Sequence, residues 1–147
     1  MRRAIISDIH ANLVALEAVL SELERQEVDS IYCLGDVIGY GPQPRECLAK
    51  SRSFELNLLG NHEEAVLYEP IGFNARAKSA VDWTKDQLRV AELTQDEKRE
   101  IWNFLGDMPA RHVEGDVLYV HGSPRDPTRV LNLTKFRENP NHMGILF

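Results

Sequence analysis

A short apolar run at the start of the chain ends in an acid and, two positions later, a histidine. Ala4 to Ile6 are followed by Asp8 and His10. The two β-branched isoleucines predict a buried strand of an α/β sheet, with a partner strand on each side. Ligands of open α/β sheets bind past the carboxyl edge, and in extended backbone two side chains one residue apart face the same way. Asp8 and His10 are therefore candidate ligands of one metal ion, although Asp8 could equally cap a helix and His10 be a polar loop residue.

The pattern of an apolar strand followed by a metal-capable side chain recurs along the chain. Strands are expected at residues 30–34, 54–59 and 117–120. Residues 13–26 have the apolar spacing of an amphipathic helix, behind Asn12 at the N-cap position. Strand, helix and strand in this order form a right-handed βαβ unit, so the strand ends meet at one edge. The side chains at the three further ends are Asp36, Asn61, His62 and His121. Taken singly, Asp36 and Asn61 could be turn residues and His121 a hydrogen-bonded strand end.

Three more helices are expected, at residues 44–50, 75–90 and 94 to about 105. Thr94 and Glu97 form a capping box at the start of the last one. Trp83 and Trp102 are interpreted as core aromatic residues. Of the remaining polar residues near these elements, Glu63 and Glu64 are interpreted as helix-start acids and His112 as a solvated strand residue.

Composition limits the class of protein. At 147 residues, the chain has the length of one domain. The formal net charge of -6 argues against nonspecific nucleic-acid binding. No apolar run approaches the roughly 18 residues of a membrane span, and Cys33 and Cys47 are too few for a disulfide framework. We therefore expect a cytoplasmic protein with reduced thiols and no membrane segment.

The chain contains, in this order, the motifs Asp8-x-His10, Gly35-Asp36, Gly60-Asn61-His62 and His121-Gly122. Together they resemble the motifs of the calcineurin-like metallophosphoesterases. The loop at 37–42 and the segments 73–76, 83–84 and 121–126 are similar to a bacterial phosphoesterase branch of the phosphodiesterase type. The resemblance covers residues 1–129, taken as one domain, and leaves 130–147 as a divergent C-terminal tail. It implies an α/β fold, a two-layer β-sandwich flanked by helices, here lacking its C-terminal strands.

The resemblance also implies a site with two divalent metal ions. Mixed oxygen and imidazole donors suit manganese, iron, zinc or nickel better than calcium. Ions about 3.5–4 Å apart clamp the attacking and leaving oxygens of a displacement, and a hydroxide shared by them would attack the phosphorus of a mono- or diester. The substrate would be a phosphorylated small molecule or nucleotide. In the implied assignment Asp8 and His10 bind one ion, Asn61 and His121 bind the other, Asp36 bridges both, His62 contacts the phosphate or protonates the leaving oxygen, and Asn12 contacts substrate.

The sequence departs from the family after Arg129. A later Gly-His-x-His segment that supplies one histidine to each metal is not found, and His142 is the one histidine that follows. The chain could be a shortened or frame-shifted form of a longer enzyme, His142 or a partner subunit could fill the gap, or catalysis could have been lost. In the last case the fold would serve as a scaffold or binding module. An open sheet edge would also favour pairing with another chain, such as a second copy.

Overall fold

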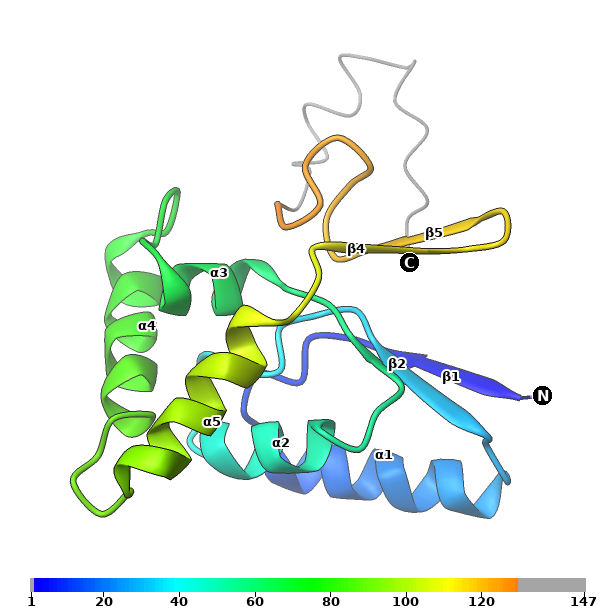
Figure 1. Ribbon diagram of the computed structural model, residues 1–147, viewed down its shortest axis with the longest axis horizontal. Coiled ribbons are helices and arrows are strands. Elements are labelled where there is room, and N and C mark those ends of the chain that lie inside the picture. Colours follow the sequence, from blue (N-terminus) through cyan, green and yellow to red (C-terminus); the bar gives the residue numbers. More distant parts are fainter. Residues whose placement is uncertain (1, 130–147) are drawn as a thin grey trace.

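A parallel three-stranded sheet lies between a β-hairpin and two helices (Figure 1). The structure is a computed structural model that describes residues 2–129, so the tail at 130–147, with His142, lies outside the described residues. The sheet order is β1-β2-β3, with strands at Arg3–Ile6, Ser30–Cys33 and Leu56–Asn57. Both neighbouring pairs are parallel, as the predicted βαβ unit requires.

The expectation that the first strand has a partner on each side is wrong for the described residues. Within residues 2–129, β1 pairs only with β2, and β2 is the central strand. Ile5 is half exposed because its strand lies at the sheet edge. The apolar run was therefore too short to distinguish a central strand from an edge strand.

A β-hairpin forms a second layer over this sheet (Figure 1). Strand β4 at Arg111–Glu114 pairs antiparallel with β5 at Val117–Val120. The Arg3 guanidinium lies 4.0 Å from the Tyr32 ring centroid and donates hydrogen bonds to Glu114 and Tyr119 of the hairpin. The His112 ring packs against both tyrosines and is partly buried, so it is less solvated than expected. The described strands thus form two small sheets that face each other.

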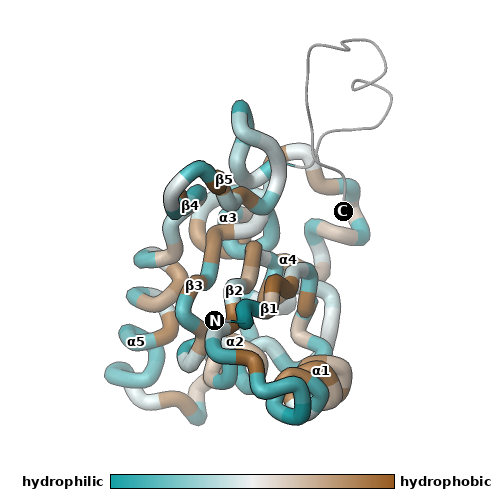
Figure 2. The backbone as a smooth tube through the Cα atoms, turned by 90° about the vertical axis from the view of Figure 1, so that its right-hand side faces the viewer, coloured by the Kyte–Doolittle hydropathy of each residue, from teal (hydrophilic) through white to brown (hydrophobic). Residues whose placement is uncertain are grey.

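Within residues 2–129, five helices surround the two sheets. Asn12 caps the first of them, since its side chain accepts the Ala15 N–H, and the Thr94–Glu97 capping box is also present. Helices α1 and α2 cover the face of the three-stranded sheet that is opposite the hairpin (Figures 1 and 2). The helices are α1 Leu13–Arg25, α2 Pro44–Ser51, α3 Asn61–Leu67, α4 Ala75–Gln87 and α5 Gln95–Gly106. The predicted α/β architecture of helices around small sheets is confirmed.

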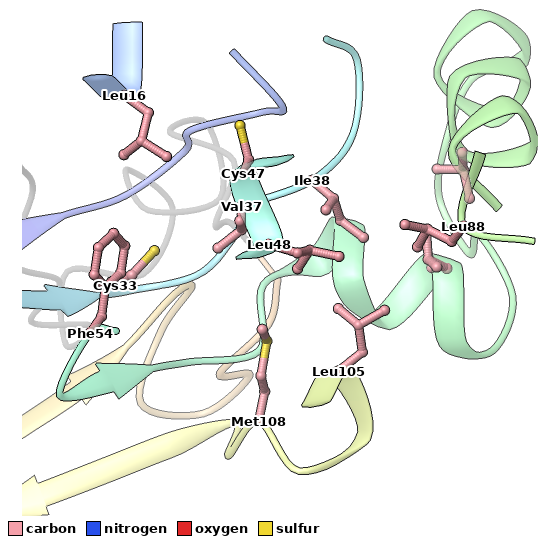
Figure 3. Packing of buried hydrophobic residues seen from close by; sticks show 13 residues of the cluster. Leu16, Cys33, Val37, Ile38, Cys47, Leu48, Phe54, Leu88, Leu105 and Met108 are labelled. Carbon is pink, nitrogen blue, oxygen red and sulfur yellow. The ribbon is translucent and has the colours of Figure 1, made fainter. Parts of the chain in front are cut away.

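The hydrophobic core lies where the sheet, α2, α3 and α5 meet (Figure 3). Ile38, Leu48 and Leu105 are fully or almost fully buried there. The interpretation of Trp83 as a core residue is wrong, because its side chain is 40% exposed on α4, whereas Trp102 packs against the core. No helix in residues 2–129 has the length and apolar character needed to cross a membrane.

Candidate metal centre

Two loops at the carboxyl edge of the sheet lie side by side and bring the first candidate ligands together. The Asp8 N–H donates to the Gly35 carbonyl at 3.1 Å, and the His10 N–H donates to the Asp36 carbonyl at 2.9 Å. These bonds continue the parallel pairing of β1 and β2 beyond the strands. Extended backbone was expected at Asp8 and His10, and this expectation is wrong. Asp8, His10 and Asp36 all have positive φ, between 48° and 56°. A positive φ strains residues other than glycine. Strain of this kind is held by the surrounding structure and is common at functional sites.

Asp36 lies at the centre of the candidate ligands. Its Oδ2 atom is 3.8 Å from His10 Nε2 and 3.5 Å from His121 Nε2. His10 Nε2 is also 3.6 Å from Asp8 Oδ1, and His121 Nε2 is 2.9 Å from Asn61 Oδ1. The structure therefore brings all five predicted ligands together from four separate loops.

Both histidines are oriented by backbone carbonyls. His121 follows β5 in the second sheet, and its Nδ1 lies 3.0 Å from the Leu34 carbonyl. His10 Nδ1 lies 3.3 Å from the Ile38 carbonyl. An Nδ1–H that donates to a carbonyl leaves the Nε2 lone pair free, which is the usual arrangement in metal-binding histidine. Both Nε2 lone pairs then face Asp36, which favours a cation between them.

Burial shifts the acidity of the central carboxylate. Asp36 is 2% exposed, and this burial raises its pKa to about 6 against the opposing hydrogen bond from the His62 N–H. Asp8 is more exposed, and the neighbouring His10 imidazole, 3.6 Å away, lowers the pKa of its carboxyl to about 2. A buried carboxylate is costly unless a positive charge compensates it. The site is thus built to receive positive charge at Asp36.

Glu63 joins the two halves of the site, a role that the sequence argument missed. Its carboxylate accepts the backbone N–H groups of Asp36 at 2.8 Å, Ile38 at 3.0 Å and Gly60 at 3.0 Å. The side chain is fully buried, which raises its pKa to about 7. Glu63 does lie in the first turn of α3, as expected. Its position three residues after Gly60, at the end of a strand, was the available signal for a structural carboxylate.

His62 sits beside the metal ligands among aromatic rings. Its backbone N–H donates to Asp36 Oδ1 at 2.9 Å, and its ring lies 4.4 Å from Tyr40, 4.8 Å from His10 and 5.0 Å from Phe73, centroid to centroid. Burial and the neighbouring charge of His10 lower its pKa to about 4. Its Nδ1 is buried without a hydrogen-bond partner. A ring nitrogen of His62 is also within 4.8 Å of ligand atoms of His10 and Asp36, so a ligand role competes with the predicted phosphate contact.

Tyr40 contacts the candidate site, whereas the side chain of Asn12 caps a helix. Tyr40, which the sequence placed only in a loop, lies over both His10 and His62 and is 56% exposed. Asn12 is exposed, and its side chain oxygen is engaged in capping α1. Its contact with substrate stays a prediction.

The family is shown by comparison with known proteins. The sequence model of the calcineurin-like phosphoesterases matches residues 1–145. The chain belongs to the calcineurin-like phosphoesterase family. Members of this family act on phosphorylated substrates and generally bind two divalent metal ions.

The individual relatives of this chain are longer than it is. Uncharacterized protein MJ0912 of Methanocaldococcus jannaschii is 37% identical over 131 residues, which cover 84% of this chain and 50% of the relative. A metallophosphoesterase from Sphaerobacter thermophilus has 44% identity and a TM-score of 0.68, over 88% of this chain and 50% of that one. A protein provisionally assigned as a diadenosine tetraphosphatase shares the fold, with 21% identity, a TM-score of 0.51 and coverage of 75% and 44%. The chain thus spans about half the length of the relatives it matches.

The residues of the candidate site fit a pair of divalent ions. Two groups of three residues could each hold an ion, because their ligand atoms lie within 4.8 Å of one another. One group is His10, Asp36 and His62, the other is Asp8, Asp36 and His121, and Asp36 belongs to both. Carboxylate and imidazole donors in this mixture suit transition metals. A carboxylate common to both groups is what a bridging ligand requires.

The raised pKa of Asp36 predicts the pH dependence of stability in metal-free protein. Between pH 4 and 6 the folded state keeps a proton that the unfolded state has lost, so Asp36 makes the wild type less stable as the pH rises. Asp36→Asn lacks this penalty, so its advantage in unfolding free energy over wild type should grow by roughly 2 kcal/mol between pH 4 and 7. Urea unfolding of both proteins in chelator measures this difference. Parallel pH profiles would contradict the assignment of a buried, uncompensated carboxylate.

Proposed function

We propose that this chain carries the site of a divalent-metal-dependent phosphoesterase that hydrolyses a phosphate mono- or diester. The supporting observation is the position of Asp36 Oδ2, between the Nε2 atoms of His10 and His121 at 3.8 Å and 3.5 Å. Asp8 would complete the ligands beside His10, and Asn61 those beside His121. Manganese, iron, zinc or nickel fits this set, and the two ions when bound would supply Lewis-acid stabilisation and a nucleophile from water.

The other residues of the site position the substrate and exclude water. His62 is neutral at pH 7 and buried, so it can hold the scissile phosphate by an N–H donor or transfer a proton to the leaving oxygen. Tyr40 and Phe73 fix its ring from two sides. All these residues lie in the proposed domain at 1–129. We expect a cytoplasmic enzyme acting on a nucleotide or another phosphorylated small molecule.

Hydrolysis of bis(4-nitrophenyl) phosphate tests this function. We expect the purified chain to release nitrophenolate when Mn²⁺ is present and to stop when a chelator removes it, since the ions would supply the Lewis-acid stabilisation and the nucleophile. The assay is repeated with Zn²⁺, Ni²⁺ and Fe²⁺ because the donors do not select among them. If no ion supports turnover and elemental analysis finds no bound metal, the proposal is wrong.

A scaffold or binding module is the second candidate function. In this chain each proposed ion would have three protein ligands, and three can hold a catalytic ion because open positions are needed for water and substrate. Bound metal with turnover supports the enzyme, whereas a folded protein that has neither supports the scaffold.

His62→Gln separates the two roles open to His62. If the ring serves phosphate and proton transfer, turnover should fall by roughly 10²- to 10⁴-fold while the metal content is unchanged. The backbone N–H that holds Asp36 remains in the variant. Steady-state kinetics and elemental analysis are compared with His112→Gln, an imidazole on β4 in the second sheet. Loss of metal from His62→Gln alone would show that His62 is a ligand.

A further inference from the structure

A cavity of about 280 Å³ lies beside the candidate metal centre. Its lining comes mainly from α3 and from the segment that connects α3 to α4, and this segment can be followed in Figure 1. Asn61, a proposed metal ligand, lines it together with the apolar side chains of Tyr68, Ile71 and Phe73. Small-molecule pockets have volumes of roughly 300–1,000 Å³, so this one is close to their lower limit. We call it the α3–α4 pocket. Through Asn61 it shares a wall with the metal centre.

The apolar lining of the α3–α4 pocket is open to solvent. Tyr68 is 69% exposed and Ile71 is 67% exposed, which places them among the most exposed large hydrophobic residues of the described chain. Phe73 connects this lining to the site, because its ring lies 5.0 Å from the His62 ring. Exposed aromatic side chains stack well against flat rings, whichever base the ring belongs to. A planar group attached to a phosphate at the metal centre would therefore find a surface here.

The charged lining distinguishes between planar ligands and anionic ones. Glu64 and Glu69 place two carboxylates in the pocket against one guanidinium, that of Arg129. Arg129 is itself paired with Asp126 at 3.7 Å, and Glu64 accepts a hydrogen bond from Thr128 at 2.8 Å. This balance disfavours a second phosphate. Carboxylates accept hydrogen bonds from ring N–H and amino groups, which nucleobases offer and plain aryl rings do not.

From this lining we infer that the α3–α4 pocket holds the base of a nucleoside phosphate whose phosphoryl group lies at the metal centre. The inference rests on the proposed function for the position of the phosphate. It adds the substrate class, which the metal ligands alone do not select. Tyr68 and Ile71 are then specificity-determining residues outside the catalytic machinery.

Equilibrium binding to the Mn²⁺-loaded protein tests the inference. Isothermal titration calorimetry compares adenosine 5′-monophosphate with ribose 5-phosphate, which lacks the base, and with phenyl phosphate, which has a ring without N–H donors. Each is used as its methylenephosphonate, because the proposed activity would hydrolyse the ester during the titration. We expect adenosine 5′-monophosphate to bind about tenfold more tightly than ribose 5-phosphate, as base stacking on an aromatic residue predicts. Equal affinities would overturn the inference. Phenyl phosphate binding as tightly as the nucleotide would replace the base with a general aryl group and would also overturn it.

Two variants locate the preference in the pocket. Tyr68→Ala should remove most of the tenfold preference, and it keeps the backbone carbonyl that accepts from Lys85 Nζ. Ile71→Ala is a second variant in the same lining. Trp83→Ala is the matched control, because Trp83 is an exposed aromatic residue of α4 outside the pocket. If Tyr68→Ala and Ile71→Ala bind both ligands as the wild type does, the base lies elsewhere and the inference fails.

Turnover of bis(4-nitrophenyl) phosphate separates this inference from the proposed function. Turnover with equal affinities for the two ribose compounds leaves the phosphoesterase in place and overturns the nucleoside pocket. A tenfold preference that depends on Tyr68, in a protein without turnover, supports the pocket and contradicts catalysis.

Discussion

Asp36→Asn should abolish metal-dependent turnover while leaving the chain folded. The carboxylate lies between two imidazoles, and its Oδ1 already accepts the His62 N–H at 2.9 Å. An asparagine that keeps this bond turns its NH₂ group toward His10 and His121, where a cation would have to bind. The NH₂ group cannot ligate and offers no charge. Because removing one partner of a buried charge pair costs about 3–5 kcal/mol, we expect at least a 10²-fold loss in metal affinity and a larger loss in turnover.

A charge-matched control distinguishes this loss from a general effect. Asp82→Asn removes the same charge from an exposed position on α4 and should leave metal content and kcat unchanged. Circular dichroism checks that both variants are folded, and elemental analysis after dialysis gives the metal content. Wild-type metal content and turnover in Asp36→Asn would remove Asp36 from the centre of the site.

Gly60→Ala should disrupt the site through a single added methyl group. A Cβ at Gly60 would lie 2.1 Å from Asp36 Oδ1 and 2.4 Å from the Asp36 backbone nitrogen. The second of these neighbours is backbone and cannot rotate away, so the loops after β2 and β3 must separate. Overpacking of this kind costs about 1–3 kcal/mol of stability. A displacement of about 1 Å at the reacting groups can lower turnover roughly 10²-fold.

Gly106→Ala provides the control within the same chain. Gly106 is the last residue of α5, and an added Cβ there meets no atom within 4 Å. Alanine is the better helix former by up to about 1 kcal/mol, so this variant should be as stable as the wild type or more so. Thermal unfolding and turnover of the two variants are measured side by side. Equal melting temperatures for Gly60→Ala and Gly106→Ala would show that the loops are not packed as described.

Short apolar runs with a donor after each were enough to predict the parallel strands and the edge where the ligands gather. Asp8, Asp36 and Asn61 follow adjacent strands, so topology alone brings them close. His121 differs, because it comes from the second sheet and reaches Asp36 only through the way the two sheets face each other. Strand order along the sequence does not contain that information. The strand-end pattern counted His121 with the other donors, but its strand belongs to the second sheet, and only the family resemblance implied its role as a ligand.

The features that the sequence argument missed depend on burial and on loop conformation. Glu63 has the composition of any helix-start acid, and its contacts with Asp36 and Ile38 exist only once the loops fold over it. Likewise, the left-handed backbone at Asp8 and His10 is set by hydrogen bonds to the neighbouring loop rather than by local preference. Trp83 was misplaced because its helix presents that position to solvent. Each of these features depends on tertiary contacts, which local sequence does not specify.

Anomalous diffraction from crystals of the Mn²⁺-loaded protein shows directly whether Asp36 bridges two ions. We expect two peaks, each at a bonding distance of about 2.0–2.2 Å from an Asp36 oxygen. One should also be bound by Asp8 and His10, and the other by Asn61 and His121. Peaks that do not contact Asp36, or a site without any peak at saturating Mn²⁺, would contradict it.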